Sequence, residues 1–264
     1  MNKITIVGGD VRLKILAKRL IEAGYSVDTL GLFDSDSADF SDSDVIILPV
    51  PTTRDRKTVF TPLTGRTIYL SEIAEKADDE TLILCCNYSF EGKNCIDYNK
   101  LDSYALLNAV PTAEGAIKIA IEETPFTLWC SRALVIGYGR VGKVLSNRLK
   151  GLGCKVTVSA RKPSDEALIK IEGYDYINTG KLLNGPLPYD IIFNTVDVKV
   201  INDSAFKDCE CALAVDLSSK GGFCITAAES AGVKSVIAPG LPGKIAPLTA
   251  GNILYETVAD IINK

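Results

Sequence analysis

Three glycines carry the clearest chemical signal in this sequence. Gly137, Gly139 and Gly142 form the pattern G-x-G-x-x-G within ALVIGYGRVG. The pattern follows an apolar run and opens a helical stretch over residues 140–150, which is the context that a dinucleotide-binding turn requires. In such turns the first glycine permits the tight turn, the second lets the backbone approach a pyrophosphate, and the third allows the helix to pack closely on the strand. The sequence therefore predicts a dinucleotide site here.

The next strand indicates which dinucleotide. An acid that binds the ribose of NAD falls about 20 residues after the motif begins. Near that distance this chain has Ser159, Ala160, Arg161 and Lys162, and no acid occurs before Asp165. A carboxylate would repel a 2′-phosphate, whereas a hydroxyl and two cations would bind it. The sequence therefore predicts NADP, and a merely basic loop is the alternative.

Further cofactor contacts are expected where the strands of this half end, because ligands of α/β sheets lie at the carboxyl ends of the strands. Two strand ends, at residues 194–196 and 216–218, should face the nicotinamide. Together with the rest of the glycine turn, the additional expected cofactor residues are Tyr138, Arg140, Val141, Asn194, Thr195, Val196, Asp216, Leu217 and Ser218.

The chain contains no histidine. This excludes histidine-based triads, histidine metal ligands and the usual acid/base residue of 2-hydroxyacid dehydrogenases. Any proton transfer must use another titratable side chain, water or another subunit.

A second glycine turn lies near the N-terminus, at Gly8-Gly9-Asp10-x-Arg12. Asp10 stands where a helix N-cap is expected. A cation at Arg12 opposes the helix dipole, which would suit an anion site, although a structural role is the open alternative.

Strand and helix patterns alternate along the whole chain, which favours parallel sheets covered by helices. The patterns predict an α/β fold with two Rossmann-like, doubly wound parallel-sheet domains and a cleft between them. Residues 1–114, completed by a C-terminal helix at 247–264, form the expected substrate domain, and residues 115–246 form the expected NADP domain. Expected strands are 4–7, 25–30, 45–50, 81–85, 104–107, 134–136, 155–158, 190–196, 212–217 and 233–238, and a helix is expected to begin at Pro111 and to end at Glu123.

Composition narrows the class of protein. The 264 residues are 47% hydrophobic with a net charge of −4, so nucleic acid is not the expected partner. No apolar run is long enough for a membrane span and no signal-peptide pattern is present, so we expect a cytoplasmic protein. The eight cysteines lack metal or redox spacing and are expected to be reduced, and the acidic run at 34–44 fails the pattern of a calcium loop. No metal is expected.

Several of these segments together resemble one family, the A subunits of dipicolinate synthase from endospore-forming bacteria. They are the turn at 8–12, LNAVPTAEG at 107–115, GYGRVG at 137–142 with Ser159-Ala160-Arg161, Asn194-Thr195, Asp216-Leu217, and APGLPGKIAPLTAGNIL at 238–254. The resemblance implies oxidation of a dihydrodipicolinate-level intermediate to pyridine-2,6-dicarboxylate, with NADP as acceptor, in the mother cell during sporulation. It also implies a partner, a flavoprotein-like B subunit, and we expect a homo-oligomer. Where the family tends to have Arg-Pro-Gly-Gly, this chain has Ser-Ser-Lys-Gly-Gly at 218–222.

A dicarboxylate substrate needs cations or helix N-termini around it. The candidates are Arg12, Lys220, the backbone amides of Thr112 and Ala113, and, as a weaker one, Lys244. Further expected substrate contacts are Asp10, beside Arg12, and Asn87 and Asn108, each taken to end a strand of the first half.

Aromatising a dihydropyridine also releases a proton. Glu114 is the leading candidate base, since it would stand in the first turn of a helix, and dipole stabilisation or proton transfer to water are the alternatives. Together, Arg12, Lys220 and Glu114 form the expected catalytic set. Two other functions stay open: an NADP-dependent reductase of oxo or imino acids, and an NADP-binding subunit that is active only with its partner.

Overall fold

The computed structural model describes residues 3–37, 39–183, 186–207, 209–218 and 221–263. The chain forms two compact units, one built from residues 1–108 with 242–264 and the other from residues 109–241. The chain passes between them within two helices, α3 (Asp102–Glu123) and α7 (Leu241–Ile245). Among the described residues, no helix has the length and apolarity needed to cross a membrane.

The first unit contains a five-stranded parallel sheet in the order β2-β1-β3-β4-β5. Its strands are β1 (Lys3–Val7), β2 (Ser26–Leu30), β3 (Val45–Ile47), β4 (Leu82–Cys85) and β5 (Cys95–Asp97). The order reverses between β1 and β3, so the segments that follow these two strands leave the sheet at a topological switch point.

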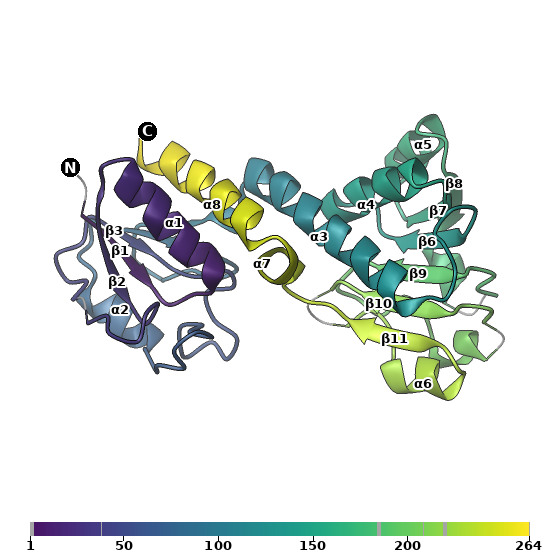
Figure 1. Cartoon of the computed structure of the whole chain (residues 1–264), viewed down its shortest axis with the longest axis horizontal. Coiled ribbons are helices and arrows are strands. Elements are labelled where there is room, and N and C mark those ends of the chain that lie inside the picture. The colour runs from purple at the N-terminus through teal and green to yellow at the C-terminus, as the bar shows by residue number, and fades with distance from the viewer. Residues whose placement is uncertain (1–2, 38, 184–185, 208, 219–220, 264) are drawn as a thin grey trace. The chain divides into compact units, whose positions relative to one another are not determined.

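Alternating side chains of this sheet enter two apolar cores. Ile4, Ile6 and Ile47 face one core, which includes residues of α1 (Val11–Glu22) and α8 (Pro247–Ile262). Val7 and Ile46 face the other, which includes α2 (Leu70–Lys76). Figure 1 shows α8, in yellow, alongside α1, in purple.

The second unit contains a six-stranded parallel sheet in the order β11-β10-β9-β6-β7-β8. Its strands are β6 (Arg132–Ile136), β7 (Lys155–Ala160), β8 (Asp175–Asn178), β9 (Ile191–Asn194), β10 (Leu213–Asp216) and β11 (Lys234–Ile237). This is the strand order of dinucleotide-binding folds, and its switch point lies between β6 and β9. The expectation of two parallel-sheet α/β units is confirmed.

Helices α4 (Arg140–Gly151), α5 (Pro163–Ile171) and α6 (Ile225–Ser230) pack on this sheet, and short 3₁₀ turns occupy Tyr98–Lys100, Thr179–Leu182 and Asp203–Phe206. One face of the sheet builds a core around Leu134, Ile192 and Phe206.

One predicted segment is wrong. Residues 104–107, expected as a strand, belong to α3, which begins at Asp102 and not at Pro111. Pro111 therefore lies inside the helix. The sequence analysis also missed the short edge strands β5 and β8, while the other predicted strands are present with ends that differ by a few residues.

Candidate functional site

The three glycines of the predicted dinucleotide turn have different surroundings, and each fits its expected part. Gly137 has φ +98°, and a Cβ there would lie 2.7 Å from Thr195 Oγ1. A Cβ on Gly142 would clash with the carbonyl oxygen of Gly137, so helix and strand touch at this point. A Cβ on Gly139, by contrast, would have no heavy atom of the described chain within 4 Å. The backbone at Gly139 is therefore open to an incoming group.

Helix α4 starts directly from this turn. Gly139 is its N-cap and supplies no side-chain bond to the first-turn amides. Its first turn contains Arg140, Val141 and Gly142 and no acidic side chain. Amide groups at a helix N-terminus bind anions through their N–H groups and the helix dipole. This end of α4 could hold a pyrophosphate.

The end of β9 is tied to the glycine turn. Thr195 Oγ1 donates a hydrogen bond of 2.8 Å to the carbonyl oxygen of Ile136, the last residue of β6. Val196 is half-buried, and its Cγ1 lies close to Gly137. Thr195 and Val196 thus stand at the switch point of this sheet, where dinucleotides bind in such folds.

Asn194 and Asp216 are buried and bonded to protein groups. Asp216 accepts hydrogen bonds from the side-chain amide of Asn194 at 2.9 Å and from the backbone N–H groups of Ser218 at 2.9 Å and Gly222 at 2.7 Å. Asn194 also donates to the carbonyl oxygen of Val196 at 2.9 Å. These two side chains shape the loops at the carboxyl edge. The groups that those loops present include half-buried Leu217 and buried Ser218.

The expectation for Ser159 needs correction. Its side chain is fully buried in β7, and its Oγ accepts a hydrogen bond of 3.2 Å from Thr179 Oγ1. A hydroxyl turned into the protein does not fit a contact with a 2′-phosphate. Ala160 is buried as well, whereas Arg161 and Lys162 are exposed directly after the strand. The two cations are the groups that can reach a phosphate.

Half-buried Asp10 and buried Arg12 form an ion pair in the first unit. Asp10 Oδ1 accepts the backbone N–H of Arg12 at 3.0 Å, which is the expected N-cap of α1. The guanidinium donates to the same carboxylate through Nε at 2.9 Å and Nη2 at 2.8 Å, and Nη2 also donates to the carbonyl oxygen of Val50. Burial alone would lower the pKa of Arg12, but the bond to Asp10 and its charge raise it.

This pairing limits what Arg12 can do for a ligand. Its side chain is 5% exposed, and its charge is balanced by Asp10. A Cβ on Gly243 of α7 would lie 2.8 Å from Asp10 Oδ2, so the backbone of α7 covers the pair. The geometry therefore supports the structural alternative for Arg12 more strongly than an anion site.

The longer α3 changes the interpretation of four predicted site residues. Asn108 does not end a strand, and the amides of Thr112 and Ala113 do not open a helix, because all three lie inside α3. Interior helix amides bond to the preceding turn and are not offered to an anion. Glu114 likewise is not in a first turn. Its carboxylate is 56% exposed and lies 3.3 Å from Arg148 Nε, which occupies it as an ion-pair partner.

The remaining substrate candidates are scattered. Asn87 lies two residues after β4 with φ 57°, and its Oδ1 accepts a hydrogen bond of 2.8 Å from Asn99 Nδ2. Lys244 is exposed on α7. Lys220 lies outside the described residues.

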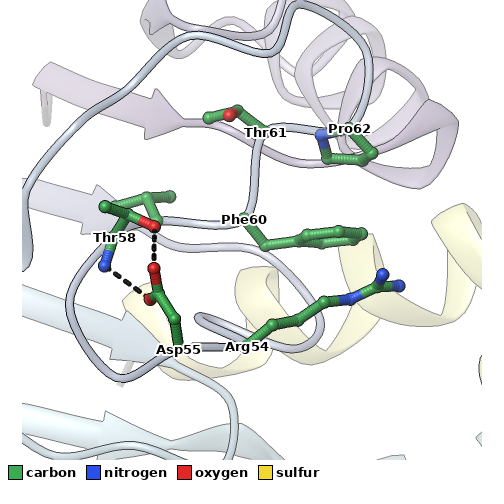
Figure 2. Close-up of a pocket in the computed structure, with 7 residues that line it drawn as sticks. Arg54, Asp55, Thr58, Phe60, Thr61 and Pro62 are labelled. Carbon is green, nitrogen blue, oxygen red and sulfur yellow. Dashed lines mark hydrogen bonds between the residues drawn. The ribbon is translucent and has the colours of Figure 1, made fainter.

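The sequence analysis did not select the segment after β3, which lines a cavity of about 280 Å³ in the first unit (Figure 2). The only local signal was a run of charges, Arg54-Asp55-Arg56-Lys57. Elsewhere in the described residues, no group of three or more acidic or cysteine side chains is arranged to hold a metal ion.

Comparisons with known proteins give consistent matches. Residues 3–107 match the family model for the N-terminal domain of the dipicolinate synthase A subunit. The chain is 30% identical to the A subunit of dipicolinate synthase from Bacillus subtilis (strain 168), covering 98% of this chain and 95% of that protein. The crystal structure of the A subunit of dipicolinate synthase from Bacillus halodurans superposes with a TM-score of 0.88 at 27% identity, covering 100% of this chain and 98% of that one. D-lactate dehydrogenase from Escherichia coli shares the fold, with a TM-score of 0.59 at 14% identity over 99% and 96% of the two chains.

Proposed function

The chain belongs to the family of dipicolinate synthase A subunits, and on that premise we propose that it is an NADP-dependent dehydrogenase. Its reaction is the oxidation of a dihydrodipicolinate-level intermediate to pyridine-2,6-dicarboxylate. The observation that carries the proposal is the glycine turn of the second unit, where Gly139 is open while Gly137 and Gly142 are closely packed.

The residues present fit a dinucleotide. The uncapped start of α4 would hold the pyrophosphate, and the open backbone at Gly139 leaves room for its approach. Thr195 and Val196, at the end of β9, would flank the nicotinamide side of the site. Arg161 and Lys162 favour NADP over NAD, because exposed cations after β7 can bind a 2′-phosphate that a carboxylate there would repel.

The nicotinamide, when bound, supplies the hydride acceptor. The protein's own task is to hold the dihydropyridine ring still while the ring loses a proton and becomes aromatic. Glu114 forms an ion pair with Arg148 and is largely exposed, so we assign the proton to water. Aromatisation favours product formation, and a strong protein base is therefore not required.

We also propose a partner. The Bacillus subtilis relative and the Bacillus halodurans structure are A subunits of dipicolinate synthase by name, and a flavoprotein-like second subunit is the partner that the family resemblance implies. A chain that binds NADP but turns over only with that subunit is the second candidate. We place the protein in the cytoplasm of a spore-forming cell as part of the same proposal.

The test is to measure NADPH formation by the purified chain, with a freshly generated dihydrodipicolinate-level substrate, with and without the flavoprotein-like subunit. Turnover by the chain alone supports the dehydrogenase. Turnover that requires both subunits supports the second candidate. Absence of NADPH formation in both cases, with NADP binding intact, would overturn both. The Gly139→Val variant serves as the control for nucleotide-dependent signal.

A further inference from the structure

The cavity of the first unit is built by the segment that follows β3. It holds about 280 Å³ and is lined by residues that include Arg54, Asp55, Thr58, Phe60, Thr61 and Pro62. The segment is fixed to the sheet, since Gly9 N–H donates to the carbonyl oxygen of Phe60 at 2.8 Å. Phe60 N–H in turn donates to the carbonyl oxygen of Thr52 at 2.9 Å, and the Thr52 hydroxyl accepts the N–H of Cys86 at 2.8 Å. The cavity wall is thus anchored to the ends of β1 and β4.

The location is one where ligands bind in such folds. The sheet order reverses between β1 and β3, and a cavity walled by the segment after β3 and packed on the turn after β1 lies at that switch point. In open α/β sheets, ligands bind in the crevice outside the strand ends at this point. Gly8 shows how close the two segments are, because a Cβ there would lie 2.9 Å from the carbonyl oxygen of Phe60.

Arg54 supplies a charge at this cavity. Its guanidinium carbon lies 4.0 Å from the centroid of the Phe60 ring, and Figure 2 shows the two side chains extending in the same direction. Stacking on a ring fixes the plane of a guanidinium and leaves its N–H edge available for a planar anion. Among the described residues, the Arg54 side chain stacks on Phe60 and forms no hydrogen bond or ion pair.

The neighbouring carboxylate does not balance that charge. Asp55 accepts the backbone N–H groups of Lys57 and Thr58, both at 2.8 Å, and the Thr58 hydroxyl at 2.7 Å. In Figure 2 the Asp55 carboxylate points to Thr58 and away from the Arg54 guanidinium. These hydrogen bonds hold the pKa of Asp55 well below its usual range. Asp55 therefore shapes the turn, and Arg54, which lines the cavity, has no ion-pair partner among the described residues, unlike Arg12.

We propose that this cavity is a carboxylate subsite and that Arg54 binds one carboxylate of the substrate, so that it determines selectivity for a dicarboxylate over a monocarboxylate. The inference rests on the proposed function for the identity of the substrate. A bidentate guanidinium–carboxylate pair beside an aromatic ring suits a planar aromatic acid. Inorganic phosphate, which offers charge without a ring, is the competing occupant that the experiment must separate.

The experiment compares two acids, with inorganic phosphate as a competitor, on the full chain with NADP present at saturation. Calorimetry gives the affinities for pyridine-2,6-dicarboxylate and pyridine-2-carboxylate in the wild type, Arg54→Gln and Arg56→Gln. Arg56 is exposed on the same turn and does not line the cavity, and its substitution removes the same charge, so Arg56→Gln is the matched control. Wild type and Arg56→Gln should prefer the dicarboxylate by roughly 10- to 100-fold, and Arg54→Gln should bind the two acids about equally.

Four results would overturn the proposal. If Arg54→Gln keeps the preference for the dicarboxylate, or if Arg56→Gln loses that preference to the same degree, Arg54 is not the residue that binds the second carboxylate. Either result leaves the proposed function unaffected. Inorganic phosphate that competes as strongly as the dicarboxylate makes the cavity a general anion site. If the wild type binds NADP but neither acid, the chain has no carboxylate subsite. The assay of NADPH formation then tests the proposed function separately.

Discussion

Asn194 donates a hydrogen bond of 2.9 Å from its side-chain amide to Oδ1 of Asp216, and the two residues are directly paired across β9 and β10. Both are buried, at 0% and 1% exposure. Gly222 completes the arrangement, because a Cβ there would clash with the Asn194 side chain. Both residues were expected to contact the cofactor, whereas in the structure their side chains hold the loops at the carboxyl edge of the sheet.

The first prediction follows from that pair. Asp216→Ala leaves the Asn194 amide and the N–H groups of Ser218 and Gly222 without their acceptor. We expect the free energy of unfolding to fall by about 2–4 kcal/mol, since each unsatisfied buried donor costs about 1–3 kcal/mol. Denaturant unfolding measures this loss. Asp175→Ala, at the exposed start of β8, is the control and should change stability by less than about 0.5 kcal/mol. Equal losses in both variants would contradict this role.

The second prediction separates two glycines of one motif. Gly139→Val should abolish NADP binding and leave the fold intact, because the side chain enters open space where a pyrophosphate would lie. Gly142→Ala should instead destabilise the protein by about 1–3 kcal/mol, since its Cβ meets the Gly137 carbonyl. Circular dichroism and nucleotide titration distinguish the two effects. Normal NADP binding by folded Gly139→Val would mean that the turn has been misread.

The third prediction concerns the choice of dinucleotide. The wild type should bind NADP more tightly than NAD, and Arg161→Gln should weaken NADP binding by roughly 10- to 100-fold while NAD binding barely changes. Lys155→Gln, at the opposite and exposed end of β7, is the control. Calorimetry with both nucleotides provides the comparison, and equal affinity of the wild type for the two would refute the preference for NADP.

The burial of Ser159 makes this position unsuitable for a test of the nucleotide preference. A carboxylate at position 159 would be buried next to Thr179, and no cation is among the described groups bonded to Ser159. Burying an unpaired charge is costly, so Ser159→Asp should unfold the second unit before it informs on selectivity.

The fourth prediction is a pH dependence in the first unit. Asp36 accepts the backbone N–H groups of Gly31, Leu32 and Phe33 at 2.7, 2.8 and 2.9 Å. Burial alone would raise the pKa of Asp36, but these bonds outweigh it and lower the pKa. Because the pKa of Asp36 is lower in the folded state than in the unfolded state, its stabilisation is present above the unfolded pKa of about 3.9. The stabilisation is lost as the pH falls through the pKa of the folded state.

Asp36→Asn should therefore lower the free energy of unfolding by about 1.5–3 kcal/mol at neutral pH, and the difference from the wild type should shrink below about pH 4. Unfolding curves at several pH values measure it. Asp34→Asn, exposed on the same segment, is the control. A difference that stays constant down to strongly acidic pH would show that the charge of Asp36 is not responsible.

The sequence predicted the glycine turn well because its rules are local. A strand, a turn with positive φ and a helix start lie within about ten residues, and Gly137 and Gly142 each answer a steric demand from their neighbours. The prediction for residues 104–111 was wrong for the opposite reason. A short apolar run such as Tyr104-Ala105-Leu106-Leu107 fits a strand or a buried helix segment equally well.

Tertiary contacts decided that segment. Tyr104 is buried edge-on against Tyr98, with ring centroids 5.3 Å apart, and this holds the start of α3. A proline inside a helix removes the bond to the carbonyl four residues earlier, here that of Leu107. Leu107 is 45% exposed, on a side of the helix that water reaches. Arg54 and Asp36 were missed similarly, because their sequence context is a charged run and their partners become visible only in the fold.

The first unit is assembled from both ends of the chain, and this orders events during synthesis. Ile253, Leu254 and Val258 of α8 belong to the same core as Leu13 and Leu16 of α1. The second unit is contiguous and can close its core on the ribosome as soon as its last strand has emerged, whereas the core of the first unit needs α8. A nascent chain, or a fragment that ends at residue 107 as the matched family model does, exposes the apolar face of α1. Chaperone engagement and proteolysis of the first unit should therefore depend on whether α8 has been synthesised.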